Sequence, residues 1–260
     1  MTSTTASYIS KHKRFWEIDL VRTVALLGLL FFHTRELLYH FDLCAEPLRS
    51  GMWVWIRAAN CGLFIFPAGV ALTIAYSRGK RMSSFMLRGL KIFGLGMLIT
   101  LLSLLVVPDE YVRFGILHFF GIAFILAPFF LRFRYINLIL GTAVMAIGIY
   151  LLDQGVSVDS RWLLWLAPYA LRTLDYWPLV PWFGIFLVGI FFGKILYPQG
   201  NRRFNIPEFS SPGASGLMLL GRHPLVVYLA HLPILIGVIL ALFPDKILPQ
   251  IKEALSYLPF

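Results

Sequence analysis

Long apolar runs dominate the hydrophobic pattern of this 260-residue chain. A membrane-spanning helix needs about 20 mostly apolar residues, because each residue rises ~1.5 Å and the hydrocarbon core is ~30 Å thick. Runs of about this length lie at 20–40, 52–77, 86–107, 113–131, 135–152, 178–197 and 217–243. The pattern therefore predicts an all-α fold, a polytopic transmembrane helical bundle with about seven spans.

Basic residues orient these predicted spans. They lie in the N-terminal tail and at the second, fourth and sixth connections, namely Lys11, Lys13, Arg14, Arg78, Lys80, Arg81, Arg88, Lys91, Arg132, Arg134, Lys194, Arg202 and Arg203. The alternate connections carry mostly Asp and Glu. Because cytoplasmic loops are enriched in Lys and Arg, the N terminus is predicted to be cytoplasmic and the C terminus outside.

The predicted organisation has three parts in the cell inner (cytoplasmic) membrane. Residues 1–19 form a cytoplasmic tail, 20–243 the transmembrane domain, and 244–260 a short outer interfacial tail. The apolar, Trp-rich segment near 160–174 is too short for a span, so we expect it to be interfacial or re-entrant. Whether it spans the membrane is left open.

Composition supports the membrane interpretation. Hydrophobic residues make up 58% of the chain and charged residues 14%, whereas soluble domains have about a quarter charged. The formal net charge of +10 lies at the connections, so we expect no nucleic-acid partner. The first apolar run lacks a small-residue cleavage site, which predicts an uncleaved helix. Cys44 and Cys61 show neither a disulfide framework nor metal spacing, and no metal is predicted.

The first predicted span carries an unusual stripe of ionisable residues, namely Asp19, Arg22, His33, Glu36 and His40. Arg22 and His33 are eleven residues apart. That spacing is roughly 1100° of rotation, about 20° past three turns, and about 16 Å along the axis. A charge facing lipid would cost about 2.5–3.5 kcal/mol, so the stripe is predicted to face the bundle interior. It places a guanidinium near the inner surface and an imidazole deeper in the bundle.

Other spans carry polar residues at middle or outer depth. The second contains Arg57 and Asn60, the fourth contains His118, and the seventh contains His231. Convergence of these groups at one depth would form a site. A single intramembrane histidine can equally be a structural hydrogen-bonding group between helices.

Four sequence blocks resemble a known family. They are "EIDLVRTVALLGLLFFH", "RFGILHFFGIA", "DYWPLVPWFGIFLVGIFFG" and "LGRHPLVVYLAHLPIL". They look like the signature blocks of bacterial membrane proteins related to the catalytic domain of heparan-alpha-glucosaminide N-acetyltransferase, within the wider group of membrane acyltransferases. The Arg22-x10-His33 spacing also resembles the first-span signature of that group. Where relatives often have Ser and Gln, this chain has Pro224 and Leu232.

The resemblance implies particular roles for some residues. In that group, an acyl group from cytoplasmic acyl-CoA reaches an acceptor on the far side of the membrane. By analogy, Arg22 helps to hold the donor and His33 handles the proton. His118 and the block containing Asp175 and Trp182 would belong to the family core.

The leading hypothesis is therefore an integral membrane acyltransferase. It would move an acetyl or other acyl group from acyl-CoA to an amine or hydroxyl of a sugar or envelope acceptor. Cations at the inner face would bind the polyanionic donor, with Asp19 paired to the first of them; these cations are Arg22, Arg88, Lys91 and Arg222.

The same hypothesis assigns the catalytic groups. His33 would accept the acceptor's proton, since its ordinary pKa lies near 6.5. Glu36 would orient it or pair with Arg57. Asn60 or His118 would donate a hydrogen bond to the developing oxyanion.

Two other classes remain open from the sequence. One is a non-enzymatic transporter or channel for a small anion or a lipid-linked precursor, because buried His and Arg also mark translocation paths. The other is a structural or assembly protein whose polar stripe sets helix register. The sequence does not decide the acceptor, the acyl length or whether the protein forms a homo-oligomer.

Overall fold

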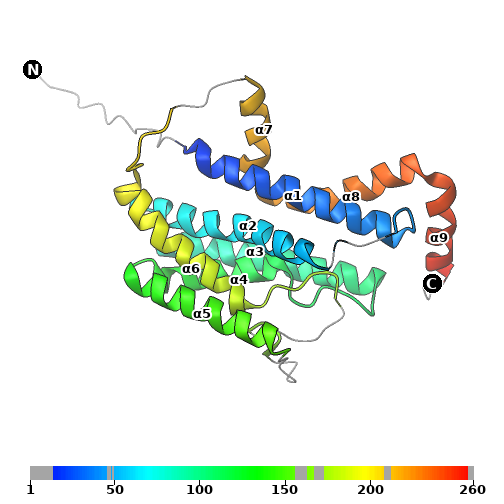
Figure 1. The fold of residues 1–260 in the computed structure, drawn as a ribbon, viewed down its shortest axis with the longest axis horizontal. Helices are drawn as coiled ribbons and strands as arrows, with labels where there is room; N and C mark the ends of the chain where they lie inside the picture. Colours follow the sequence, from blue (N-terminus) through cyan, green and yellow to red (C-terminus); the bar gives the residue numbers. More distant parts are fainter. Residues whose placement is uncertain are drawn as a thin grey trace, which may run out of the picture.

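The computed structural model describes residues 14–45, 48, 50–155, 163–166, 173–207 and 212–256. Within these residues the regular elements are helical, apart from one isolated β-bridge between Phe114 and Tyr176. The helices are α1 (Trp16–His40), α2 (Met52–Ser77), α3 (Met82–Val106), α4 (Ile116–Phe130), α5 (Tyr135–Asp153), α6 (Leu179–Leu196), the 3-10 turn η2 (Pro198–Gly200), α7 (Pro212–Arg222), α8 (Pro224–Leu242) and α9 (Pro244–Ser256) (Figure 1). The prediction of an all-α bundle is confirmed.

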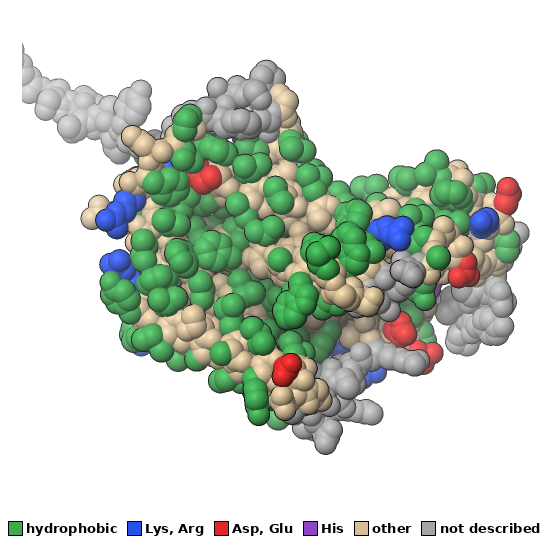
Figure 2. Space-filling view, viewed as in Figure 1, with side chains coloured by type: hydrophobic (Ala, Val, Ile, Leu, Met, Phe, Trp, Pro, Cys, Tyr) green, Lys and Arg blue, Asp and Glu red, His purple; other side chains and the backbone are tan. Residues whose placement is uncertain are grey.

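Among the described residues, five helices are long and apolar enough to cross a membrane: α2, α3, α5, α6 and α8. α1 is long enough but carries the ionisable stripe, and α4 has only 15 residues. In Figure 2 hydrophobic side chains cover the middle of the visible face, and most Lys, Arg, Asp and Glu side chains lie towards its ends. The chain is thus a multi-pass membrane protein, while the count of seven spans and the orientation stay predictions.

The helices pack around α4 and α6. α3 packs on α4, α5 and α2 pack on α6, and α1 lies against α2, α7 and α8 (Figure 1). Large side chains such as Phe119, Phe186 and Ile190 are completely buried in the main core. This arrangement leaves one face of α1 directed at α2 and another at the α7–α8 pair.

Small residues allow α2 and α6 to approach closely. A Cβ atom added to Gly69 would overlap the carbonyl oxygen of Phe186 and lie 2.9 Å from the backbone nitrogen of Ile190. Gly189 meets the backbone of Phe66 in the same way. These glycines are needed because only a hydrogen atom fits between the two backbones.

The predicted span at 217–243 starts too early, because the structure divides this range between α7 and α8, and only α8 is long and apolar enough to cross a membrane. The break lies at His223, whose backbone has φ −125° and ψ 51°. Pro224 follows, and a proline lacks the N–H needed to continue a helix and disfavours the α conformation in the residue before it. The N–H of Gly221 donates instead to Thr23 Oγ1 at 3.1 Å, which fastens the end of α7 to α1.

Three predicted segments are only partly described: the segment at 160–174 and the two terminal tails. Most of 160–174 lies outside the described residues, as do 1–13 and 257–260. Within 163–166, the carbonyl oxygens of Trp165 and Leu166 accept hydrogen bonds from the N–H groups of Leu179 and Val180 at 2.9 and 2.8 Å. These bonds place residues 163–166 beside the start of α6.

Candidate functional site

A cavity of about 460 Å³ opens at the N-terminal end of α1. It is lined from α1, the residues before it, and the C-terminal part of α2 with its following turn, namely Arg14, Phe15, Ile18, Asp19, Arg22, Ala71, Ile74, Ala75, Arg78, Gly79 and Lys80. Four of these side chains are cationic and one is acidic. The excess of positive charge favours a polyanionic ligand, since charge-assisted hydrogen bonds to phosphate are strong.

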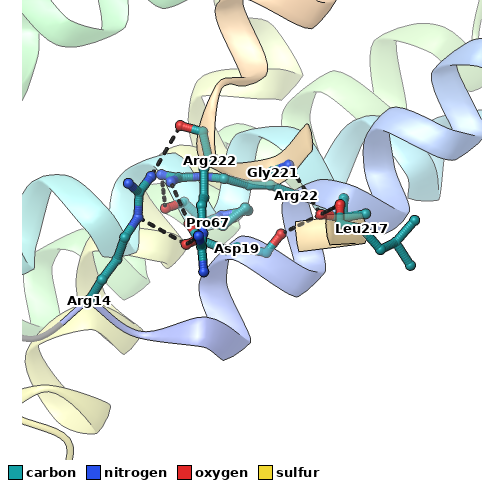
Figure 3. A network of polar contacts seen from close by, with 8 residues as sticks. Arg14, Asp19, Arg22, Pro67, Leu217, Gly221 and Arg222 are labelled. Carbon is teal, nitrogen blue, oxygen red and sulfur yellow. Dashed lines mark hydrogen bonds and ion pairs between the residues drawn. The ribbon is translucent and has the colours of Figure 1, made fainter. Parts of the chain in front are cut away.

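Asp19 organises the cations at this end of α1 (Figure 3). Its carboxylate is 2.9 Å from Arg14 Nε and 3.8 Å from both Arg22 Nη1 and Arg222 Nε. Arg14 also donates to the carbonyl oxygen of Arg222 at 3.1 Å, and Arg22 to that of Pro67 at 3.5 Å. One carboxylate, only 3% exposed, therefore holds three guanidinium groups that it cannot fully neutralise.

The predicted donor-binding residues do not all reach the cavity. Arg22 lines it, and together with Arg88 it also lines an adjoining pocket of about 50 Å³. The Arg88 guanidinium lies over the Phe124 ring, 5.3 Å from its centroid. Arg222 joins the group through Asp19. Lys91 is exposed and lines neither of these two cavities.

Arg78 and Lys80 were not predicted as donor-binding residues. They lie just after α2, and in the sequence they indicate only the orientation of the spans. Arg78 Nε donates to the carbonyl oxygen of Gly200 at 3.0 Å, and its guanidinium lies 4.9 Å from the Phe15 ring centroid. Burial lowers the pKa of Arg78, but an arginine stays cationic at pH 7. The sequence could have predicted their position, because the end of α2 must lie beside the beginning of α1 when the two helices are antiparallel.

An ion pair fastens the segment after α6 to the start of α1. Arg202 donates to both carboxylate oxygens of Glu17, at 2.8 and 2.6 Å, and Tyr197 Oη donates to Glu17 at 2.8 Å. Both charged side chains are mostly buried, with 12% and 17% exposed. Phe15 packs on the Tyr197 ring, with centroids 4.8 Å apart. The cavity wall at Phe15 therefore depends on this ion pair.

We expect Glu17→Gln to lower the free energy of unfolding by about 2 kcal/mol, because hydrogen bonds to charged groups contribute about 1.5–3 kcal/mol each. Thermal and denaturant unfolding of the purified protein measure the change. Glu36→Gln is the matched control, since the 3.5 Å pair of Glu36 with Arg57 is longer and more exposed. Equal losses in the two variants would contradict the prediction.

A second polar group lies further along α1, around His33. Its Nδ1 is 3.0 Å from the carbonyl oxygen of Leu29, and its ring centroid is 4.8 Å from that of His231 on α8. His231 is hydrogen-bonded through Nδ1 to the carbonyl oxygen of Tyr228. Tyr228 Oη in turn donates to Asp175 Oδ2 at 3.4 Å. We refer to His33, His231, Tyr228 and Asp175 as the histidine cluster.

Asp175 is held by groups from α4 and from its own loop. The N–H of Ile116, the first residue of α4, donates to Asp175 Oδ2 at 2.9 Å, and the indole of Trp177 donates to Oδ1. Burial raises the pKa of the Asp175 carboxyl, and these two hydrogen bonds oppose that rise. Tyr228 was missed by the sequence analysis, although its i, i+3 spacing to His231 places both on one face of a helix.

Glu36 and Asn60 lie between α1 and α2. Glu36 Oε2 is 3.5 Å from Arg57 Nη2, which is the pairing that the sequence suggested. Asn60 Nδ2 donates to the carbonyl oxygen of Ala25 at 3.2 Å. Glu36 therefore belongs to α1, the helix that carries His33, and Asn60 contacts that helix from α2.

His118 sits between α3 and α4 and is 2% exposed. Its Nδ1 accepts from the N–H of Gly115 at 3.1 Å. Thr100 Oγ1 donates to the carbonyl oxygen of Val112 at 2.6 Å, so it accepts from His118 Nε2, 3.3 Å away. These partners use both ring nitrogens to cap the start of α4, and none of them belongs to the histidine cluster.

The cavity and the histidine cluster share α1 but are separate in the structure. Arg22 lines the cavity, whereas His33 does not. Ala25 and Leu26 lie between them on α1 and are completely buried. Within the described residues, no three or more His, Cys, Asp or Glu side chains are grouped so as to hold a metal ion.

Comparison with known proteins gives one match. Residues 14–233 match the family model described as "Heparan-alpha-glucosaminide N-acetyltransferase, catalytic". No curated protein matches the chain, and no solved structure does. The matched segment contains both the cavity and the histidine cluster, and it confirms the resemblance of the four sequence blocks.

Proposed function

The chain belongs to the family of the heparan-alpha-glucosaminide N-acetyltransferase catalytic domain, and from this premise we propose that it transfers an acetyl group from acyl-CoA. The acceptor would be an amine or hydroxyl of a sugar or envelope glycan. The family suggests a membrane acetyltransferase, and acetyl-CoA is the donor that we propose. The observation that carries the proposal is the cationic cavity at one end of α1 with an imidazole further along the same helix.

The cavity is the proposed site for the nucleotide end of the donor. Coenzyme A carries several phosphate charges, and guanidinium groups bind phosphate through paired hydrogen bonds. Arg22, Arg78 and Lys80 line the cavity, and Arg88 adjoins it. The basic residues near this end of the bundle support a cytoplasmic location, where acetyl-CoA is made.

His33 is the proposed general base. The carbonyl of Leu29 can only accept a hydrogen bond, so His33 Nδ1 carries the hydrogen and Nε2 of the neutral ring carries a lone pair. This lone pair would take the proton of the acceptor as the acceptor attacks the thioester carbon. The new bond to nitrogen or oxygen forms, the carbon–sulfur bond breaks, and the sulfur finally receives the proton.

Asn60 and Glu36 are proposed to support this reaction. An amide side chain has two N–H donors, and Ala25 accepts one from Asn60. The other is our candidate for the developing oxyanion. The Glu36–Arg57 pair fixes the outer part of α1 against α2 near His33.

The test uses the purified protein with labelled acetyl-CoA and a panel of amino sugars and envelope glycans. Appearance of an acetylated product, with a rise in the thermal midpoint on adding acetyl-CoA, supports the proposal. A transporter would instead move solute across liposomes with no product and no response to acetyl-CoA. That outcome would contradict the proposed enzyme activity and favour a transporter.

Removing a cavity cation should weaken donor binding. We expect Arg22→Gln and Arg78→Gln each to raise the KM for acetyl-CoA about tenfold, because a charge-assisted hydrogen bond contributes about 1.5–3 kcal/mol. Arg78→Gln is the cleaner variant, because it leaves the Asp19 ion pairs intact. Lys91→Gln serves as the control with an exposed side chain outside both cavities. An unchanged KM in both arginine variants would show that the donor does not bind in this cavity.

A further inference from the structure

We propose that His231 is the proton-relay partner of His33, a role that rests on the acetyl transfer proposed above. His231 would act through His33 and not on the substrate directly, so it is a positioning residue. The relay would hold the acceptor's proton within the protein until the sulfur of the leaving group takes it. Two observations carry the inference: the contact of the two rings and the hydrogen bond that each ring makes.

The two imidazoles are in direct contact. Their centroids are 4.8 Å apart and their planes are at 83°. They come from α1 and α8, helices that lie side by side (Figure 1). His231 is 3% exposed, so its ring is surrounded by other protein atoms.

The hydrogen bonds assign the same tautomer to both neutral rings. Each Nδ1 faces a backbone carbonyl, of Leu29 for His33 and of Tyr228 for His231. A carbonyl oxygen only accepts, so each Nδ1 must carry hydrogen and each Nε2 must carry a lone pair. The protein thus places two basic nitrogens in adjacent rings.

His231 Nε2 is one of several buried side-chain atoms in the described part of the chain for which no hydrogen-bond partner is found. Burying an unpaired acceptor destabilises a protein, and native structures rarely retain one without a reason. His231 Nε2 is not hydrogen-bonded to His33 in the structure, where the rings meet edge to face. A proton on His33 would supply the missing partner once the rings turn so that the Nε2–H of one points at Nε2 of the other.

Charged and titratable groups around the pair favour a shared proton. Asp175 interacts electrostatically with His33 and is hydrogen-bonded to Tyr228, whose carbonyl orients His231. An ionised Asp175 stabilises a positive charge on the pair. From the α1–α2 side, Glu36 is paired with Arg57, so that pair adds little net charge.

The proton balance needs no further reactant. The acceptor loses one proton to His33 Nε2 as it bonds to the acyl carbon. That proton is shared with His231 Nε2 while the carbon–sulfur bond breaks and its electron pair stays on sulfur. The thiolate then takes the proton back through His33, and both rings return to their neutral forms.

His231→Asn tests the relay. The Asn amide can still donate to the Tyr228 carbonyl, but it cannot carry the extra proton. We expect kcat to fall at least about tenfold, within the range of general acid–base effects, while the KM for acetyl-CoA stays unchanged. His223→Asn is the matched control, because His223 is exposed at the α7–α8 break. It should retain the wild-type kcat.

A second variant keeps the test decisive if His231→Asn unfolds. His231→Ala leaves space for a free imidazole, and we expect added imidazole to restore part of the lost turnover in the folded variant. Wild-type kcat in His231→Asn would overturn the relay, as would a folded His231→Ala that imidazole does not restore. If the wild-type protein itself transfers no acetyl group, the proposed function fails; if it does, only the relay is at stake.

Discussion

His33→Ala should reduce acetyl transfer by about 100- to 10,000-fold, the usual contribution of a positioned general base. The expected loss is in kcat, because His33 lies outside the lining of the cationic cavity where the donor's nucleotide end is proposed to bind. The KM for acetyl-CoA and the donor-induced rise in thermal midpoint should therefore change little. Steady-state kinetics and thermal unfolding with and without acetyl-CoA measure the two effects separately.

His40→Ala is the matched control for this variant. His40 lies on the same helix but is exposed at its end, in contact with Phe41. It should retain wild-type turnover. Full turnover in His33→Ala would remove His33 from the reaction, whereas a parallel loss in His40→Ala would point to damage of α1 as a whole.

Gly69→Ala is expected to destabilise the protein by about 3 kcal/mol, at the upper end of the usual range for overpacking. The added methyl group would meet the backbone of α6 at Phe186 and Ile190, and backbone atoms cannot move aside as a flexible side chain can. The α2–α6 contact must therefore open along its length. Unfolding by heat and by denaturant in the same detergent measures the loss.

Gly94→Ala in α3 provides the control, because its added Cβ would meet nothing within 4 Å. Replacing a glycine inside a helix by alanine usually stabilises it by about 0.5–1 kcal/mol. We therefore expect the two substitutions to change stability in opposite directions. A Gly69→Ala protein as stable as the wild type would show that α2 and α6 do not pack as closely as described.

Proposals for this protein depend on helix pairings that sequence periodicity does not specify. The stripe on α1 predicted that Asp19, Arg22, His33 and Glu36 face the bundle. The structure confirms that each contacts a neighbouring element, but the partners differ along the helix. The N-terminal part of α1 contacts α2, α7 and the residues before α1. Glu36 contacts α2, and His33 contacts α8.

Several site residues could not be assigned without these pairings. His118 looked equivalent to His33 in depth and type, yet its ring nitrogens are used at the start of α4. Arg78 and Lys80 looked like orientation signals, yet they line the cavity. In each case the residue type was visible, whereas its neighbour depends on which helix packs there and how that helix is rotated.

The amino-acid sequence alone determined the helices, the membrane class and the polar face of α1, because hydrophobic length and 3.6-residue periodicity are local properties. α2 was even predicted with its observed bounds, 52–77. Only the tertiary structure decided the break at His223, the cavity around Arg22 and the contact of His33 with His231. These features bring together residues up to about two hundred positions apart, as Gly221 and Thr23 are, and such contacts arise from packing between helices and not from the pattern within any one of them.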